Sequence, residues 1–265
     1  MARNGRPLAL VTGASSGIGA SLARELATDG HDLILCARRV EPMRALASEL
    51  KAIGCACSVI PADLGKSGAA AALVQEIEAK GLVVDVLINA AGFGVNGRFD
   101  LTDPFRISEM LAVNVVALSE LTRLLLPGMV RRRRGRVMLV ASTAAFQPGP
   151  QMAVYCASKA FVLSFGEAIA FELEGTGVSV TTLCPGATAT EFATVAKAGD
   201  SALFKGGLVP VMSASEVARL GYAGLKARRP VVVTGLLNRI MAVSSQLSPA
   251  PVKLRIASWM MSTGR

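Results

Sequence analysis

Tyr155 and Lys159 are the residues whose types and spacing most directly suggest proton transfer. On a helix, side chains four positions apart lie on one face, so the Lys159 ammonium would sit beside the Tyr155 phenol. A phenol normally loses its proton near pH ~10, and a neighbouring cation lowers that pKa. We therefore expect Tyr155 to exchange a proton with an alcohol or a carbonyl as a general acid or base.

A glycine-rich turn, Thr12-Gly13-Ala14-Ser15-Ser16-Gly17-Ile18-Gly19, lies near the start of the chain. It joins an apolar, strand-like run at 8–11 to a helical pattern at 21–27. Glycines let a pyrophosphate approach the backbone, and a helix N-terminus offers free N–H groups. The turn thus predicts an anion cradle, although its spacing differs from the usual G-x-G-x-x-G. Taken alone, the glycines could also serve only a tight turn.

With these motifs the chain resembles the short-chain dehydrogenase/reductase family over roughly residues 6–235. The matching motifs follow the family's order and are Thr12-Gly13-xxx-Gly17-x-Gly19, Asp63-Leu64, Asn89-Ala90-Ala91-Gly92, Asn114, Ser142, Tyr155-xxx-Lys159 and Pro185-Gly186-xxx-Thr190. Ala90 departs from the family's usual Asn-Asn-Ala-Gly. The resemblance implies hydride transfer between a nicotinamide cofactor and a carbonyl or secondary alcohol.

The resemblance also implies a role for each motif residue. Cofactor-binding residues would be Gly13, Ser15, Ser16, Gly17, Ile18, Gly19, Arg38, Asp63, Leu64, Asn89, Gly92, Tyr155, Lys159, Pro185, Gly186, Thr188 and Thr190. Ser142 would polarise the substrate oxygen, and Lys159 would lower the Tyr155 pKa and hold the nicotinamide ribose. Asn114 would anchor a water that leads protons to Lys159. In isolation, Ser142 could merely end a strand and Asn114 could be a solvated helix residue.

The end of the second expected strand predicts which cofactor is used. An acidic residue there would bind the ribose 2′-hydroxyl of NAD, but Ala37 takes that place and Arg38 and Arg39 follow it. A guanidinium can bind a phosphate through two hydrogen bonds, which favours NADP(H). Of the two arginines, we expect Arg39 to face solvent. The alternative, with both arginines on a solvated loop, stays open.

Apolar runs alternate with helical stretches along the chain, at 33–35, 83–88, 137–140 and 178–183. This rhythm predicts parallel strands covered on both faces. We expect an α/β fold, a Rossmann-type doubly wound parallel sheet in a single domain. The domain would span residues 1–235, and 236–265 would form an amphipathic C-terminal tail of the same domain.

The composition indicates the cellular location of the protein, the state of its cysteines and whether it binds a metal. No convincing membrane span or secretory signal is visible, so we expect a cytoplasmic protein. The five cysteines form no CxxC pair and are expected to be reduced thiols. No cluster of ligand residues suggests a metal, and His31 is expected to cap a helix at the surface.

The substrate is expected to be large and apolar. Residues around the expected cleft carry few charges and include Phe93, Phe146, Pro148, Met152, Phe192, Phe204 and Met212. Residues 187–212 are long for a connection, and such segments often serve as lids. A surface loop that never touches substrate is the other interpretation. Fatty-acyl ketones, steroids and xenobiotic carbonyls all stay open.

Two basic features lie outside the motifs. The chain has a formal net charge of +9, and the run Arg131–Arg134 is expected to be a solvated helix cap. No nucleic-acid motif accompanies it. The apolar and basic tail could cover the cleft, join another subunit of a homodimer or homotetramer, or touch a membrane with Trp259 as an anchor. Two other functions stay open: a regulatory protein that binds cofactor without useful turnover, and a peripheral membrane protein.

Overall fold

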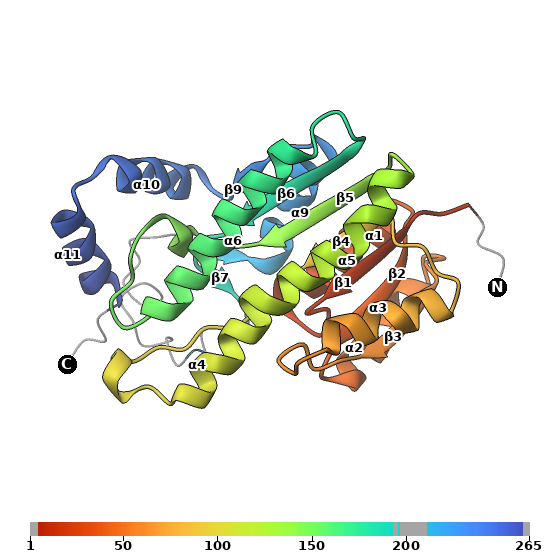
Figure 1. Ribbon diagram of the computed structural model, residues 1–265, viewed down its shortest axis with the longest axis horizontal. Coiled ribbons are helices and arrows are strands. Elements are labelled where there is room, and N and C mark those ends of the chain that lie inside the picture. Colours follow the sequence, from red (N-terminus) through yellow and green to blue (C-terminus); the bar gives the residue numbers. More distant parts are fainter. Residues whose placement is uncertain (1–4, 193–195, 197–210, 262–265) are drawn as a thin grey trace.

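The computed structural model describes residues 5–192, 196 and 211–261 of the chain. Its centre is a seven-stranded parallel sheet in the order β3-β2-β1-β4-β5-β6-β9 (Figure 1). The strands are β1 (Leu8–Thr12), β2 (Asp32–Ala37), β3 (Cys57–Pro61), β4 (Val86–Asn89), β5 (Gly135–Val140), β6 (Val178–Cys184) and β9 (Val231–Val233). The strand order reverses beside β1, so the predicted doubly wound Rossmann-type sheet is confirmed.

Helices connect these strands. They are α1 (Gly17–Thr28), α2 (Val40–Lys51), α3 (Ala69–Ala79), α4 (Pro104–Leu111), α5 (Leu118–Arg131), α6 (Ala153–Glu172), α9 (Ala214–Lys226), α10 (Leu236–Leu247) and α11 (Ala250–Met261), with short 3₁₀ helices η1 (Phe99–Leu101) and η3 (Thr143–Phe146). A small parallel pair, β7 (Thr188–Ala189) and β8 (Met212–Ser213), lies between β6 and β9 in the sequence.

Each face of the sheet has its own hydrophobic core, because alternate side chains of a strand point to opposite faces. Leu8 and Leu10 of β1 pack with α3, α5 and α6, whereas Ala9 and Val11 pack with α1, α2 and α9. Figure 1 shows α5 and α6 running along the near face of the sheet. Strands buried on both sides explain the continuous apolar runs of the sequence.

Helices α4 and α5 join through η2 (Ala112–Ala117), a π-helical segment that the sequence did not predict. Such segments are rare and often lie at functional sites. The continuous helix Pro104–Arg131 and helix α6 are long and apolar enough to cross a membrane by length and composition. Each nevertheless packs one face against the sheet, through residues such as Leu121 and Val162.

The expectation for His31 is wrong, whereas the expectation for the five cysteines is met. His31 is buried at 4% exposure, so its expected surface position is wrong. Its Nδ1 lies 3.2 Å from the carbonyl of Leu26 near the end of α1, and burial lowers its pKa. All five cysteines are free, as expected, and burial raises the pKa of Cys184 to about 12.

The run of four arginines begins at Arg131, the last residue of α5, and continues beyond the helix. Arg132 donates to the carbonyl of Val84 at 2.9 Å, and Arg133 donates to that of Gly175 at 3.1 Å. Arg133 takes a left-handed conformation with φ 51°. These contacts tie the helix end to neighbouring loops, so the run is more than a solvated cap.

Candidate active site

A cleft of about 490 Å³ lies along the carboxyl edge of the sheet. The ends of β1, β2, β3, β4, β5 and β6 all contribute to its wall. Among the predicted site residues, its lining includes Gly13, Ser15, Ser16, Gly17, Ile18, Gly19, Arg38, Asp63, Leu64, Gly92, Ser142, Tyr155, Lys159, Pro185, Gly186, Thr188 and Thr190. Parallel strands bring these distant segments together because their carboxyl ends share one edge.

The glycine turn is held against β4 by Thr12. Its hydroxyl oxygen accepts hydrogen bonds from the backbone N–H groups of Ala90 and Ala91, both at 3.1 Å. A Cβ on Gly13 would lie 2.8 Å from the Ala90 carbonyl, and a Cβ on Gly19 would lie 2.3 Å from the Gly13 carbonyl. Only glycine allows this approach, which also needs positive φ at Gly13 and Gly17.

Helix α1 begins at Gly17 with no side chain capping its N-terminus. Its first N–H groups are therefore available to an anion in the cleft, supported by the helix dipole. The cradle thus has the backbone donors, the close approach and the shape that a dinucleotide pyrophosphate needs. The residues present fit this group: residues 13–19 would hold the phosphates, and Lys159 would lie toward the nicotinamide.

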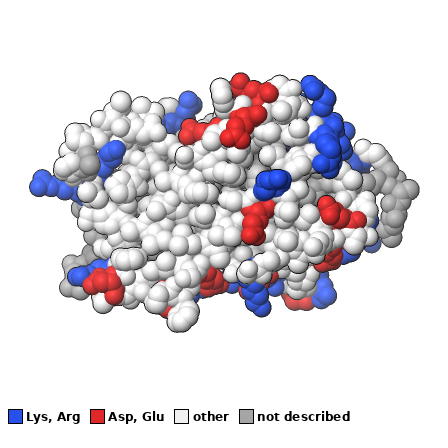
Figure 2. Space-filling view, in the orientation of Figure 1, with Lys and Arg blue, Asp and Glu red and all other residues white. Residues whose placement is uncertain are grey.

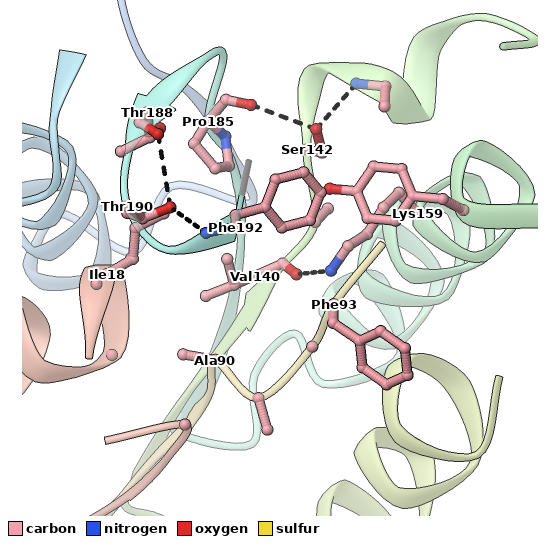
Figure 3. Close-up of a pocket in the computed structure, with 18 of the residues that line it drawn as sticks. Ile18, Ala90, Phe93, Val140, Ser142, Lys159, Pro185, Thr188, Thr190 and Phe192 are labelled. Carbon is pink, nitrogen blue, oxygen red and sulfur yellow. Dashed lines mark hydrogen bonds between the residues drawn. The ribbon is translucent and has the colours of Figure 1, made fainter. Parts of the chain in front are cut away.

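Ser142 and Lys159 lie across the cleft from Ile18 of the cradle (Figure 3), and Tyr155 also lines the cleft. Ser142 follows β5, and its Oγ accepts from the Ala144 N–H at 3.1 Å, which fixes the hydroxyl. Tyr155 and Lys159 lie one turn apart on α6, both buried. The Lys159 Nζ lies 5.8 Å from the centre of the Tyr155 ring and donates to the Val140 carbonyl at 2.8 Å.

The ionisation of this group differs from the sequence-based expectation. Burial raises the pKa of Tyr155 well above its usual value, and its hydrogen bond with Ser142 acts in the opposite direction. Burial lowers the pKa of Lys159 to about 8. The sequence predicted a lowered Tyr155 pKa, whereas desolvation is the largest influence in the protein alone and raises it.

Asn114 lies in the π-helical segment, fully buried and outside the cleft lining. Its Oδ1 accepts from the Phe93 N–H at 3.1 Å, and its Nδ2 donates to the Phe93 carbonyl at 3.0 Å. A Cβ on Gly92 would lie 3.0 Å from that Oδ1 and 3.4 Å from Lys159 Nζ. Asn114 therefore holds the 92–93 backbone next to Lys159.

Asn89 does not reach the cleft either. Its Nδ2 donates to the Thr122 hydroxyl at 3.0 Å, so the side chain points into α5. This buried bond fixes the end of β4 against α5. The Asn89 side chain thus lies behind the cleft wall, where it fixes backbone beside the predicted cofactor site.

The two arginines after β2 both line the cleft mouth, each with an acidic partner. Arg38 pairs with Glu109 at 2.9 Å, and Arg39 pairs with Glu191 at 2.6 Å. Arg39 also comes within 3.5 Å of the Ser15 hydroxyl in the cradle. Its side chain is 50% exposed against 58% for Arg38, so the expectation that Arg39 is the solvent-facing one is wrong.

Two parts of the cleft wall lie outside the predicted site residues. Glu191, which also lines the cleft, gave no signal because its role depends on a partner 152 positions away. Helix α10 contributes Asn238, Met241, Ala242 and Ser245. Their spacing follows one helical face, a pattern that could have predicted the contact. Of the three options for the tail, covering the cleft is therefore the one that the position of α10 supports.

Some of the apolar residues that were expected around the cleft do line it. Phe93, Phe146, Met152 and Phe192 line it, and the rings of Phe192 and Tyr155 lie 5.2 Å apart. Pro148 and Met212 are not among the lining residues. Phe204 and most of the expected lid at 187–212 lie outside the described residues, as does the side chain of Trp259.

Comparison with known proteins agrees with this geometry. The family model described as short chain dehydrogenase matches residues 7–200. The chain belongs to the short-chain dehydrogenase family. The ketoacyl reductase HetN of Nostoc sp. is 33% identical over 256 residues, covering 94% of this chain and 88% of HetN. This family membership makes the chain an oxidoreductase that binds a nicotinamide cofactor and a small-molecule substrate.

Solved structures of the short-chain dehydrogenase family share the fold closely. A short-chain dehydrogenase from Sphingobium yanoikuyae in complex with NADPH is 31% identical, with a TM-score of 0.79 over 90% of this chain and 92% of that one. A bulky-bulky ketone specific alcohol dehydrogenase from Comamonas testosteroni is 28% identical, with a TM-score of 0.76 over 91% and 93% of the two chains.

Proposed function

We propose that this short-chain dehydrogenase is an NADP(H)-dependent carbonyl reductase or alcohol dehydrogenase for bulky apolar substrates, with Tyr155 as its general acid and base. One observation carries the proposal. Ser142, Tyr155 and Lys159 lie on one wall of a cleft that also holds the glycine cradle and Phe93, Met152 and Phe192. The site thus combines proton transfer, cofactor binding and an apolar surface.

The bound nicotinamide would supply the hydride, or accept it in the reverse direction. Ser142, fixed by the Ala144 N–H, would donate a hydrogen bond to the substrate oxygen. Tyr155 would give its proton to that oxygen during reduction and take it back during oxidation. Lys159 would hold the ribose and stabilise the phenolate that forms. Asn114 would keep Gly92 and Phe93 in place beside Lys159, next to the water it is expected to anchor.

The preference for NADP(H) rests on charge at the cleft mouth. Arg38 and Arg39 follow β2, where a 2′-phosphate would lie, and no carboxylate occupies the position of Ala37. The Sphingobium relative binds NADPH, which supports this choice. The preference for bulky apolar ketones agrees with the aromatic lining and with the substrate in the name of the Comamonas relative.

A panel of ketones of increasing size tests the proposal, with NADPH oxidation followed by absorbance. We expect turnover with bulky apolar ketones, and weaker turnover when NADH replaces NADPH. The Ser142→Ala variant tests the site directly. It removes one hydroxyl, so we expect a lower kcat, while the cradle should still bind NADPH. NADPH binding without turnover of any substrate in either direction would favour the regulatory alternative.

A further inference from the structure

Helix α10 presents two different faces. Its inner face lines the cleft, and the Ser245 hydroxyl donates to the Phe146 carbonyl at 2.9 Å. On the opposite face, large apolar residues recur every three or four positions, which places them in one stripe. They are Leu236, Ile240, Val243 and Leu247, with exposures of 73%, 57%, 59% and 82%. We call these four residues the outer stripe. Since the inner face already covers the cleft, the part of the chain that the structure describes leaves the outer stripe exposed.

The adjoining helix α11 also exposes apolar side chains. Val252, Leu254 and Ile256 are 46%, 43% and 49% exposed. Figure 1 shows α10 and α11 together at one end of the molecule, away from β1, β2 and β3. Contiguous apolar surface of this kind usually marks an interaction site.

The charged residues of the C-terminal segment are of one sign. Residues 217–265 contain eight Lys or Arg and no Asp or Glu, against a formal net charge of +9 for the whole chain. Arg239, Lys253 and Arg255 lie within α10 and α11, and none forms an ion pair within the part of the chain that the structure describes. In Figure 2 this end is mostly uncharged, with Lys and Arg at its edge and a few Asp or Glu at its lower edge.

We propose that the outer stripe docks on the surface of an anionic lipid bilayer, assisted by α11. An apolar stripe flanked by unpaired basic residues is the pattern of helices that lie in a membrane interface. Anionic headgroups would attract Arg239, Lys253 and Arg255, while the four apolar side chains would enter the headgroup boundary.

A second copy of the chain fits this surface less well. A symmetric dimer places the same patch on both sides of the interface. Arg239, Lys253 and Arg255 of one subunit would then face the same cations of the other, and α10 and α11 contain no acidic residue to offset them. Docking on a bilayer would instead place the cleft wall formed by α10 beside the membrane. The proposal concerns binding and does not depend on the substrate.

Cosedimentation of the full-length protein with vesicles tests the proposal without any substrate. We expect the protein to pellet with phosphatidylcholine vesicles that contain phosphatidylglycerol, to remain in solution with phosphatidylcholine alone, and to be released by salt. Ile240→Glu should weaken binding about tenfold or more, because an apolar side chain leaves the interface. Arg239→Gln should weaken it about fivefold.

Ile53→Glu is the matched control, since Ile53 lies after α2 and is 54% exposed, close to the 57% of Ile240. It should bind vesicles like the unmodified chain, and circular dichroism should show that all variants are folded. Retention in the supernatant with both lipids would overturn the proposal. So would an Ile240→Glu variant that lowers the mass measured by light scattering while leaving vesicle binding unchanged, because the stripe would then be a subunit interface.

Discussion

At the scale of single residues, the chemistry depends on Tyr155 and Lys159, whose burial disfavours their charged forms. Lys159 is only 6% exposed, and its ammonium bonds the Val140 carbonyl. The sequence predicted that Lys159 and Tyr155 share one face of a helix, and the two residues do lie one turn apart on α6. The direction of the Tyr155 pKa shift could not be predicted from the sequence, because it depends on how much water the folded protein excludes from this side chain.

Lys159→Met should stabilise the folded protein at neutral pH. The Lys159 pKa is about 8 in the folded chain against an ordinary 10.5, so the unfolded chain binds this proton more tightly. Below pH 8 the buried charge costs up to about 3 kcal/mol, less the lost hydrogen bond to Val140, and this cost disappears as pH rises from about 8 to 10.5. Urea unfolding at pH 7 and pH 10 should therefore show a gain of about 1–3 kcal/mol that shrinks at pH 10.

The exposed Lys80 provides the comparison for this effect, because Lys80→Met removes a lysine whose side chain is 48% exposed. We expect no comparable gain for Lys80→Met at either pH. A Lys159→Met variant less stable than the unmodified chain at pH 7 would show that burial does not penalise the charge.

Arg39 should distinguish the two nicotinamide cofactors. Arg39→Ala should weaken NADPH binding about ten- to hundredfold while leaving NADH nearly unchanged, because only NADPH offers a phosphate to the guanidinium. Glu191→Gln should strengthen NADPH binding, since the carboxylate 2.6 Å from Arg39 no longer competes for it. Fluorescence titration with each cofactor measures both effects.

Arg38→Ala should act in the same direction as Arg39→Ala, because both arginines line the cleft. Arg44 provides a control, since it pairs with Glu41 on α2 and is not among the lining residues. Equal losses for NADPH and NADH in Arg39→Ala would show that this arginine does not read the phosphate.

At the scale of elements, the sequence was most informative where one segment determines its own structure. The apolar runs predicted the central strands, and the glycine spacing predicted the turn before α1. The π-helical segment around Asn114 was missed, and the cleft-covering position of α10 was only one of three options for the tail, because both depend on contacts with distant segments. For the same reason, Asn89 points into α5 and away from the cleft.

Packing between α6 and β6 sets a strict size limit at Gly166. A Cβ there would lie 2.0 Å from the Thr182 hydroxyl and 3.2 Å from Leu139, so Gly166→Ala should destabilise the fold by about 1–3 kcal/mol. Gly128 in α5 would meet only the flexible side chains of Arg131 and Arg132. Gly128→Ala should stabilise the fold by about 0.5–1 kcal/mol, as alanine usually does in a helix. Thermal unfolding of both variants compares the two sites, and similar losses would contradict this packing.

At the scale of the whole molecule, the parallel sheet makes one site from segments spread over the chain. Gly13, Ser142 and Gly186 follow three different strands and line one cleft. The doubly wound topology predicts that shared edge, so most of the site could be predicted from motif order. The ion pair of Arg39 with Glu191 and the uncovered stripe on α10 could not, because they arise only when the chain folds.

The central claim is that Tyr155 transfers the proton in an NADPH-dependent reduction. Its most direct test is the turnover of Tyr155→Phe on the best ketone found, together with NADPH titration of the same variant. We predict that kcat falls by about 10²–10⁴-fold, the usual contribution of general acid catalysis, while NADPH affinity stays nearly unchanged because the cradle at 13–19 remains intact. An unchanged kcat would contradict the assignment of Tyr155.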